Sequence, residues 1–214
     1  MSQVLALLAL LTLNFGGWAV VTIGDLPDQI AVGQPVTLDF TVRQHGHTLL
    51  SNLNPRVMAV AGQDQVSAVV QPGPSAGRYR ASLTLPHAGA WTITVYSGFG
   101  NSNVTLLPVP AVSPGRAVPE IAAAERGRRL FVAKGCITCH VHPEVPASGV
   151  VNVGPDLTGR RFIGDYLQRF LADPNIATTR GAGGFEMPNL NLAPREIAAL
   201  AAFINGEPVA QSGQ

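Results

Sequence analysis

The chain has 214 residues, enough for one large domain or two small ones. Its 14 Lys and Arg residues nearly balance 13 Asp and Glu residues, so the net charge of +1 gives no reason to expect a nucleic-acid partner. Charged residues make up only 13%, while Gly and Pro number 23 and 17, a composition that favours short strands and turns over long helices.

Residues 1–17 contain an apolar run over 4–13 that only Thr12 interrupts. Such a run is typical of the hydrophobic part of a secretory signal peptide. No Lys or Arg precedes Arg43 and no A-x-A cleavage site follows, so an uncleaved membrane anchor and a mis-assigned start remain open alternatives. Whether it is a signal peptide or an anchor, the segment predicts a periplasmic or other extracytoplasmic protein. If the segment is kept in the mature protein, it predicts membrane association through the N-terminus.

Apolar and polar residues alternate from residue 18 to about residue 107, which places one face of each strand in a core and the other in water. Turn signals rich in Gly, Pro, Asp and Asn separate about seven expected strands, over 19–23, 34–43, 56–61, 64–71, 78–85, 90–97 and 102–107. Short strands at this spacing predict an immunoglobulin-like β-sandwich over 18–107. Both cysteines lie further on, so its core contains no disulfide.

Two phrases, DLPDQIAVGQPVTLDFTVRQHGHT and GRYRASLTLPHAGAWTITV, resemble the FixH/YtkA-like group of small exported β-sandwich domains. The resemblance covers residues 20–107. It implies attachment to a membrane or to a redox or metal-handling system.

Proline recurs at four positions between residues 108 and 119, which removes amide donors and stiffens the chain. This segment is expected to be a semi-rigid linker. Beyond it the apolar spacing becomes helical, with expected helices from about 120 to 134, over 165–172 and over 194–204. Pro194 suits the first turn of the last helix and Gly206 suits its end. A tail follows at 207–214.

Cys136, Cys139 and His140 form a C-x-x-C-H motif, the attachment motif of c-type haem. Two thiols three residues apart can reach the two vinyl groups on one porphyrin edge, and the next side chain then points at the iron. The alternatives are a disulfide or thioredoxin-like redox pair and a zinc site. The redox pair lacks a surrounding βαβ pattern, and the zinc site lacks a second ligand pair beyond His142.

The segments RGRRLFVAKGCITCH, GPDLTGR, DYLQRFLADP, MPNL and EIAALAAFI, in that order over 120–206, resemble class I monohaem cytochromes c. The resemblance implies one haem c bound by thioethers to Cys136 and Cys139, with His140 and Met187 as axial ligands. It also implies that the Pro155 carbonyl orients His140. Arg160 and Arg161 are candidates to approach a haem propionate. Gly127 and Phe131 of the first helix are expected to meet Ala202 and Phe203 of the last.

Met187 also stands out by elimination, because Met1 and Met58 lie outside the helical part. A thioether stabilises Fe(II), so His/Met ligation raises the reduction potential and fills both axial positions. The sequence therefore predicts two domains, an all-β immunoglobulin-like sandwich followed by an all-α cytochrome c domain. The expected function is single-electron transfer to redox protein partners or within a membrane respiratory complex, and not catalysis.

The alternative function is a haem-based sensor or a copper-handling module. His45 and His47 flank a glycine in an expected turn, and with His87 and Met58 they are candidate copper ligands. Polar turns also carry histidine without binding metal. His142 is expected to be a solvated loop residue, and the arginines at 126, 128 and 129 either form a solvated helix face or help dock an acidic partner.

Overall fold

The computed structural model describes residues 16–116, 119–147, 149, 151–176 and 184–206. The expected signal peptide or anchor lies almost wholly within residues 1–15, outside the described ranges. The glycine-rich loop at 177–183 and the tail at 207–214 lie outside them as well. Within the described ranges, no helix has the length and apolar character needed to cross a bilayer.

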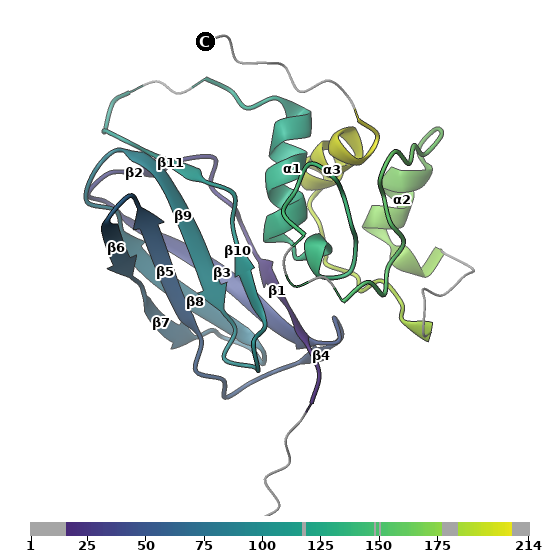
Figure 1. The fold of residues 1–214 in the computed structure, drawn as a ribbon, viewed down its shortest axis with the longest axis horizontal. Coiled ribbons are helices and arrows are strands. Elements are labelled where there is room, and N and C mark those ends of the chain that lie inside the picture. The colour runs from purple at the N-terminus through teal and green to yellow at the C-terminus, as the bar shows by residue number, and fades with distance from the viewer. Residues whose placement is uncertain (1–15, 117–118, 148, 150, 177–183, 207–214) are drawn as a thin grey trace, which may run out of the picture.

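In the part of the chain that the structure describes, eleven strands form two sheets that pack as an immunoglobulin-like β-sandwich (Figure 1). One sheet has the order β1-β3-β8-β7 with β4 on β3, and the other has the order β2-β11-β9-β5-β6 with β10 on β9. The strands are β1 (Ala19–Ile23), β2 (Ile30–Ala31), β3 (Pro35–Gln44), β4 (Thr48–Leu49), β5 (Arg56–Ala61), β6 (Asp64–Ser67), β7 (Val69–Pro72), β8 (Arg78–Thr84), β9 (Gly89–Tyr96), β10 (Asn103–Thr105) and β11 (Val109–Val112).

The sandwich core is built from the alternating positions that the sequence marks. On β3, Leu38 and Phe40 are buried, and on β9 the ring of Trp91 is fully buried. Period two therefore sets which face of each strand is inside, as predicted. The Trp91 indole also donates to the His87 carbonyl at 3.1 Å, so its one polar atom is satisfied.

The single strand predicted over 64–71 is instead two strands in different sheets. β6 pairs with β5, and β7 pairs with β8. The chain changes sheet at Ala68, whose amide donates to the Val57 carbonyl at 2.9 Å. Apolar and polar residues alternate in the same way before and after Ala68. The local sequence pattern therefore does not indicate that the chain changes from one sheet to the other.

The predicted linker over 108–119 is wrong in its first half, because residues 109–112 form β11. This strand is antiparallel to β9 and parallel to β2. Val109 and Ala111 point into the core with 2% and 3% exposure, while Pro110 lies between them on the outer face. The apolar alternation determines the structure here. Proline has no amide hydrogen for a neighbouring strand, but β2 pairs with β11 only at Ala111 and Val112, so Pro110 lies just before that pairing begins.

The helical segments are α1 (Ala123–Ala133), the 3₁₀ turn η1 (Cys136–Thr138), α2 (Tyr166–Ala172), the 3₁₀ turn η2 (Pro174–Ile176) and α3 (Pro194–Ile204). α1 and α3 cross at Gly127, where a Cβ atom would lie 1.9 Å from the Ala199 carbonyl oxygen. The rings of Phe131 and Phe203 meet edge to face at 5.6 Å. The predicted crossing through Gly127, Phe131 and Phe203 is confirmed, with Ala199 at the closest point.

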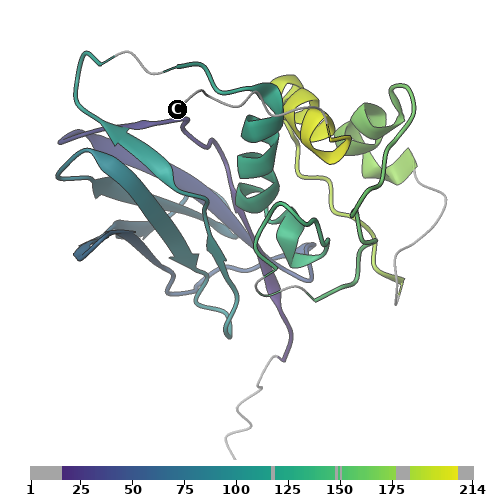
Figure 2. The same ribbon diagram turned by 45° about the horizontal axis from the view of Figure 1, so that its top comes forward.

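The predicted fold class is wrong in its second part, because the helices do not form a separate all-α cytochrome c domain. α1 packs against β1 and β10, and the buried apolar residues of sheets and helices form one continuous core (Figures 1 and 2). Three α-helices of 11, 7 and 11 residues among the described residues enclose too little volume for a core of their own. The protein is mostly β-sandwich, with short helices packed on its β1 side.

β1 gives the physical reason for this arrangement. All five of its residues are buried, which means that both faces of this edge strand are covered. Val21 and Ile23 face the sandwich core, and Val20 and Thr22 face the helical side. The sequence AVVTI is nearly continuous in apolar residues and does not alternate, which is the pattern of a strand buried on two sides.

Candidate functional site

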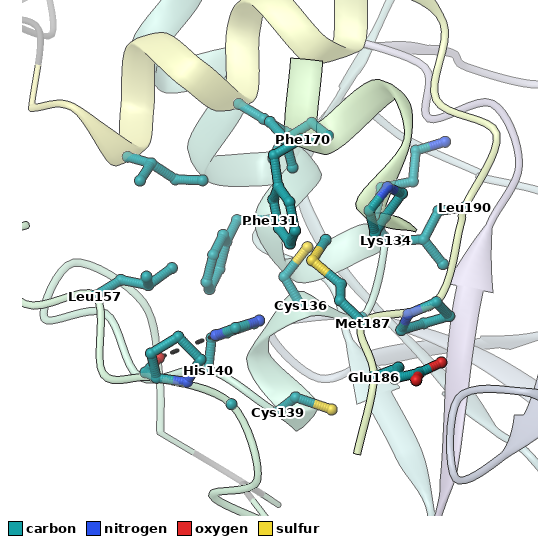
Figure 3. A pocket seen from close by; sticks show the side chains of 18 of the residues that line it. Phe131, Lys134, Cys136, Cys139, His140, Leu157, Phe170, Glu186, Met187 and Leu190 are labelled. Carbon is teal, nitrogen blue, oxygen red and sulfur yellow. Dashed lines mark hydrogen bonds between the residues drawn. The ribbon is translucent and has the colours of Figure 1, made fainter. Parts of the chain in front are cut away.

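A cavity of about 760 Å³ lies between the helices and the β1 side of the sandwich (Figure 3). The C-x-x-C-H turn and the Met187 segment both open into it. Its wall includes the predicted site residues Cys136, Cys139, His140, Pro155, Arg160 and Met187, helical side chains such as Phe131, Leu167 and Phe170, and the sandwich residues Trp18, Val20 and His45. A concave, largely apolar space with a few polar groups is the usual form of a cofactor site.

The C-x-x-C-H turn follows directly from the end of α1. Gly135 has a φ of 79°, a left-handed conformation that glycine adopts without strain, and it turns the chain out of the helix into η1. A Cβ atom there would lie 2.5 Å from Val20 Cγ1 and 2.7 Å from the Val21 carbonyl oxygen. The turn therefore packs directly against β1, so the sandwich determines where the C-x-x-C-H motif enters the cavity.

Both cysteines are free thiols in a non-polar setting. Burial raises the pKa of Cys136 to about 12 and the pKa of Cys139 to about 11. Thiols with such pKa values are protonated at neutral pH, which disfavours the redox-pair alternative because it uses the thiolate. Within the described ranges, no three His, Cys, Asp or Glu side chains gather as a metal-ion site, so His142 brings no zinc ligand set with it.

His140 is oriented by the loop that follows the motif. Its Nδ1 lies 2.9 Å from the Pro155 carbonyl oxygen, the hydrogen bond that the sequence predicts. A carbonyl only accepts, so Nδ1 carries the proton and Nε2 keeps its lone pair. Burial lowers the pKa of His140, against the opposing effect of this hydrogen bond, and thus favours the neutral imidazole that a metal needs. A Cβ atom at Gly154 would lie 2.6 Å from the imidazole, so glycine is required beside it.

Met187 reaches the same cavity from a segment late in the chain. In Figure 3 its side chain and that of His140 enter from opposite sides of the view. Met58, by contrast, lies on β5 opposite Ser67 and Thr94, away from the cavity. Of the two methionines that the structure describes, only Met187 is placed to share a ligand with His140.

The two arginines that are candidates to approach a haem propionate lie in different places. Arg160 lines the cavity and donates through Nε to the Asp156 carbonyl at 2.5 Å. Arg161 lies outside the lining, and its guanidinium is close to Gly206. A propionate contact for either remains a prediction, with Arg160 the better placed.

The other predicted histidines and arginines occupy different settings. His142 is buried, with its ring 4.2 Å from the ring of Phe203, so its prediction as a solvated residue is wrong. Arg128 and Arg129 both pair with Glu125 on α1, and Arg126 pairs with Asp28 of the sandwich. Arg126 therefore joins α1 to the sandwich, whereas Arg128 and Arg129 are paired within their own helix, which leaves less of their charge for a docking surface.

The proposed copper ligands do not come together. His45 and His47 follow β3 at its Gln44 end, whereas His87 follows Thr84 of β8, which pairs with Pro35 at the other end of β3. Ten residues of β3 separate the two ends by roughly 30 Å. His87 bonds instead to Asp64 at 3.0 Å.

Sequence reasoning missed a buried ion pair between the end of α1 and α3, whose lysine also reaches the sandwich. Lys134 Nζ lies 2.8 Å from Glu196 Oε1, and both side chains are buried. Nζ also donates to the carbonyls of Ile23, at 3.0 Å, and Gly24. Glu196 Oε2 accepts from the Ala193 amide at 2.9 Å. The signal was present: Lys134 is the only lysine in the chain and follows the apolar end of a helix.

No protein-family model and no curated protein matches the chain. Among solved structures, the Lin-41 filamin domain is 14% identical at a TM-score of 0.36, covering 44% of this chain and 90% of that one. Domains 4–9 of the surface layer protein SbsC are 21% identical at 0.36, covering 48% and 15%. The superoxide reductase (neelaredoxin) from Ignicoccus hospitalis is 14% identical at 0.30, covering 44% and 80%. None of the three is a cytochrome, and likenesses at such TM-scores carry no argument about function.

Proposed function

We propose that the chain binds one covalent haem c in this cavity and passes single electrons between redox partners outside the cytoplasm. Cys136 and Cys139 would form the two thioethers, and His140 and Met187 would bind the iron. Bound haem supplies a one-electron iron couple, whose potential a thioether ligand raises. The residues of the chain would hold and orient this group and exclude water, and with both His140 and Met187 bound to the iron no substrate position would be left.

The main support is the shared cavity. Both cysteines, His140 and Met187 line one space, although Met187 is distant in sequence. His140 presents the Nε2 lone pair because Pro155 fixes its tautomer, an arrangement common to histidines that bind metals. The protonated thiols are not suited to the thiolate chemistry of a redox pair.

The likeness to class I cytochromes c is carried by the site motifs and their order. The partner class is a redox protein or a membrane respiratory complex, because the site has no means of catalysis of its own. Periplasmic placement, with membrane association if residues 1–17 are kept, follows from the apolar N-terminus and from the need for haem attachment outside the cytoplasm.

Intact mass of the protein produced with haem-attachment machinery tests the proposal. We expect the mass of one haem on the wild-type chain and its loss in the variant lacking both thiols, Cys136→Ala/Cys139→Ala. Met187→Leu should retain the haem but lower the reduction potential and let the reduced protein bind CO. Met58→Leu is the matched control and should do neither. A wild-type protein that binds CO rapidly would favour the sensor alternative and contradict the carrier.

A further inference from the structure

The turn between β3 and β4 contacts the segment that carries Met187. His47 Nε2 lies 2.9 Å from the Glu186 carbonyl oxygen, across 139 positions of sequence. A carbonyl only accepts, so the His47 ring donates this hydrogen bond. The residue directly before Met187 is therefore tied to the sandwich.

A cluster of three rings reinforces this contact. Trp18 lies 5.3 Å from His45 and 6.0 Å from Phe185, and His45 lies 6.1 Å from Phe185. Trp18 and His45 belong to the sandwich, and Phe185 lies two positions before Met187. All three line the cavity, so the cluster is part of its wall. Aromatic pairs at such separations attract beyond the area they bury.

Gly46 brings the turn against the other side of Met187. It is buried and has a φ of 82°, which glycine adopts freely. A Cβ atom at this position would lie 3.3 Å from Pro188 Cγ. The sandwich thus contacts Phe185 and Glu186 before the methionine and Pro188 after it.

The helical side holds the same segment less closely. Asn189 Nδ2 donates to the Ala172 carbonyl of α2 at 3.4 Å, a long bond. Asn189 otherwise accepts from the Asn191 amide within its own segment, at 2.8 Å. The contacts from the His45–His47 turn are shorter and lie on both sides of Met187.

We propose that the His45–His47 turn positions Met187, so that the sandwich controls whether the sixth coordination position is closed. The inference rests on the proposed haem function. His47 is a positioning residue, acting through the Glu186 backbone, and Trp18 and His45 act through the Phe185 ring. Loosening the turn populates a state in which Met187 is withdrawn, and an external ligand gains affinity in proportion to that population.

The test is an imidazole titration of the oxidised full-length holoprotein, followed by haem absorption. In His47→Ala the dissociation constant should fall about three- to tenfold, the effect of one hydrogen bond on a local opening equilibrium. His47→Gln restores an N–H donor and should return towards the wild-type value. His87→Ala removes a sandwich histidine distant from the cavity and should change the constant less than about twofold. Phe185→Leu, which removes the ring cluster alone, should act in the direction of His47→Ala.

The outcomes separate this inference from the proposed function. If the wild-type chain carries no haem by intact mass, or if Met187→Leu binds imidazole no more tightly than wild type, the proposed function fails and this inference with it. If Met187→Leu gains affinity but His47→Ala and Phe185→Leu both titrate like wild type, the positioning role alone is overturned. Full haem loading and an unchanged circular dichroism spectrum verify that each variant is folded.

Discussion

Replacing Lys134 by Met is expected to weaken the whole molecule and not only its helices. The ammonium group is buried with 5% side-chain exposure against Glu196 at 7%, and it serves two carbonyls at the end of β1. Methionine keeps the apolar stem but leaves the Glu196 carboxylate buried without its cation. Breaking one half of a buried pair costs about 3–5 kcal/mol.

The loss corresponds to a fall in melting temperature of about 6–20 °C for a chain of this size. Adding Glu196→Gln to Lys134→Met removes the unpaired charge but leaves the carbonyls of Ile23 and Gly24 without their donor. The double variant should therefore recover to a deficit of about 1–3 kcal/mol. Glutamine still accepts from the Ala193 amide, so the start of α3 keeps its cap.

Arg195→Met is the matched control because Arg195 also joins the helices to the sandwich, through Asp25 at 3.3 Å. That pair is exposed, with side chains 68% and 79% accessible, and should contribute less than about 1 kcal/mol. Calorimetry should give one transition that moves as a whole in Lys134→Met. Two transitions, of which only one moves, would refute the single core and restore two independent domains.

Three further substitutions test the packing. Gly135→Ala should cost over 2 kcal/mol more than Gly62→Ala in urea unfolding, because both sites have a left-handed φ but only Gly135 meets β1. Hydrogen bonds from two arginines outweigh burial and lower the pKa of Glu125, so its stabilisation is present above the ordinary carboxyl range and lost as the pH falls through the lowered pKa. Glu125→Gln should therefore be less stable by under about 1 kcal/mol at neutral pH, and the difference should vanish in acid. Tyr79→Phe leaves the Leu50 carbonyl without its donor, at a cost of about 1–3 kcal/mol in melting experiments.

The strands and helices with local signals could be predicted from the sequence. β1 and β5 have the predicted bounds, and α3 runs from Pro194 to Ile204 as expected from its proline start and Gly206 end. The sequence did not indicate which strands pair with one another. The change of sheet at Ala68 and the strand at 109–112 depend on neighbours far along the chain, which alternation does not encode.

The candidate site divides in the same way. The order of Cys136, Cys139 and His140 is local, and the hydrogen bond to Pro155 could be predicted because a motif carries it. The part of the cavity wall formed by Trp18 and His45 could not be predicted, because no local sequence pattern indicates that either residue lies near Phe185. Both faces of β1 are covered, one by the sandwich core and the other by the helices. The sequence shows this only as five consecutive residues, AVVTI, that are nearly all apolar.

The cavity is lined by Trp18, near the start of the described chain, and by Ile204, near its end. All the strands of the sandwich precede α3 in sequence, so the sandwich sheets can pair before the last helix docks. The C-x-x-C-H turn is then already present, but the far wall is not. The cavity therefore stays open on one side until α3 docks, which leaves a route of entry for the proposed haem. Loss of α3 would leave this side of the cavity open and Lys134 buried without Glu196.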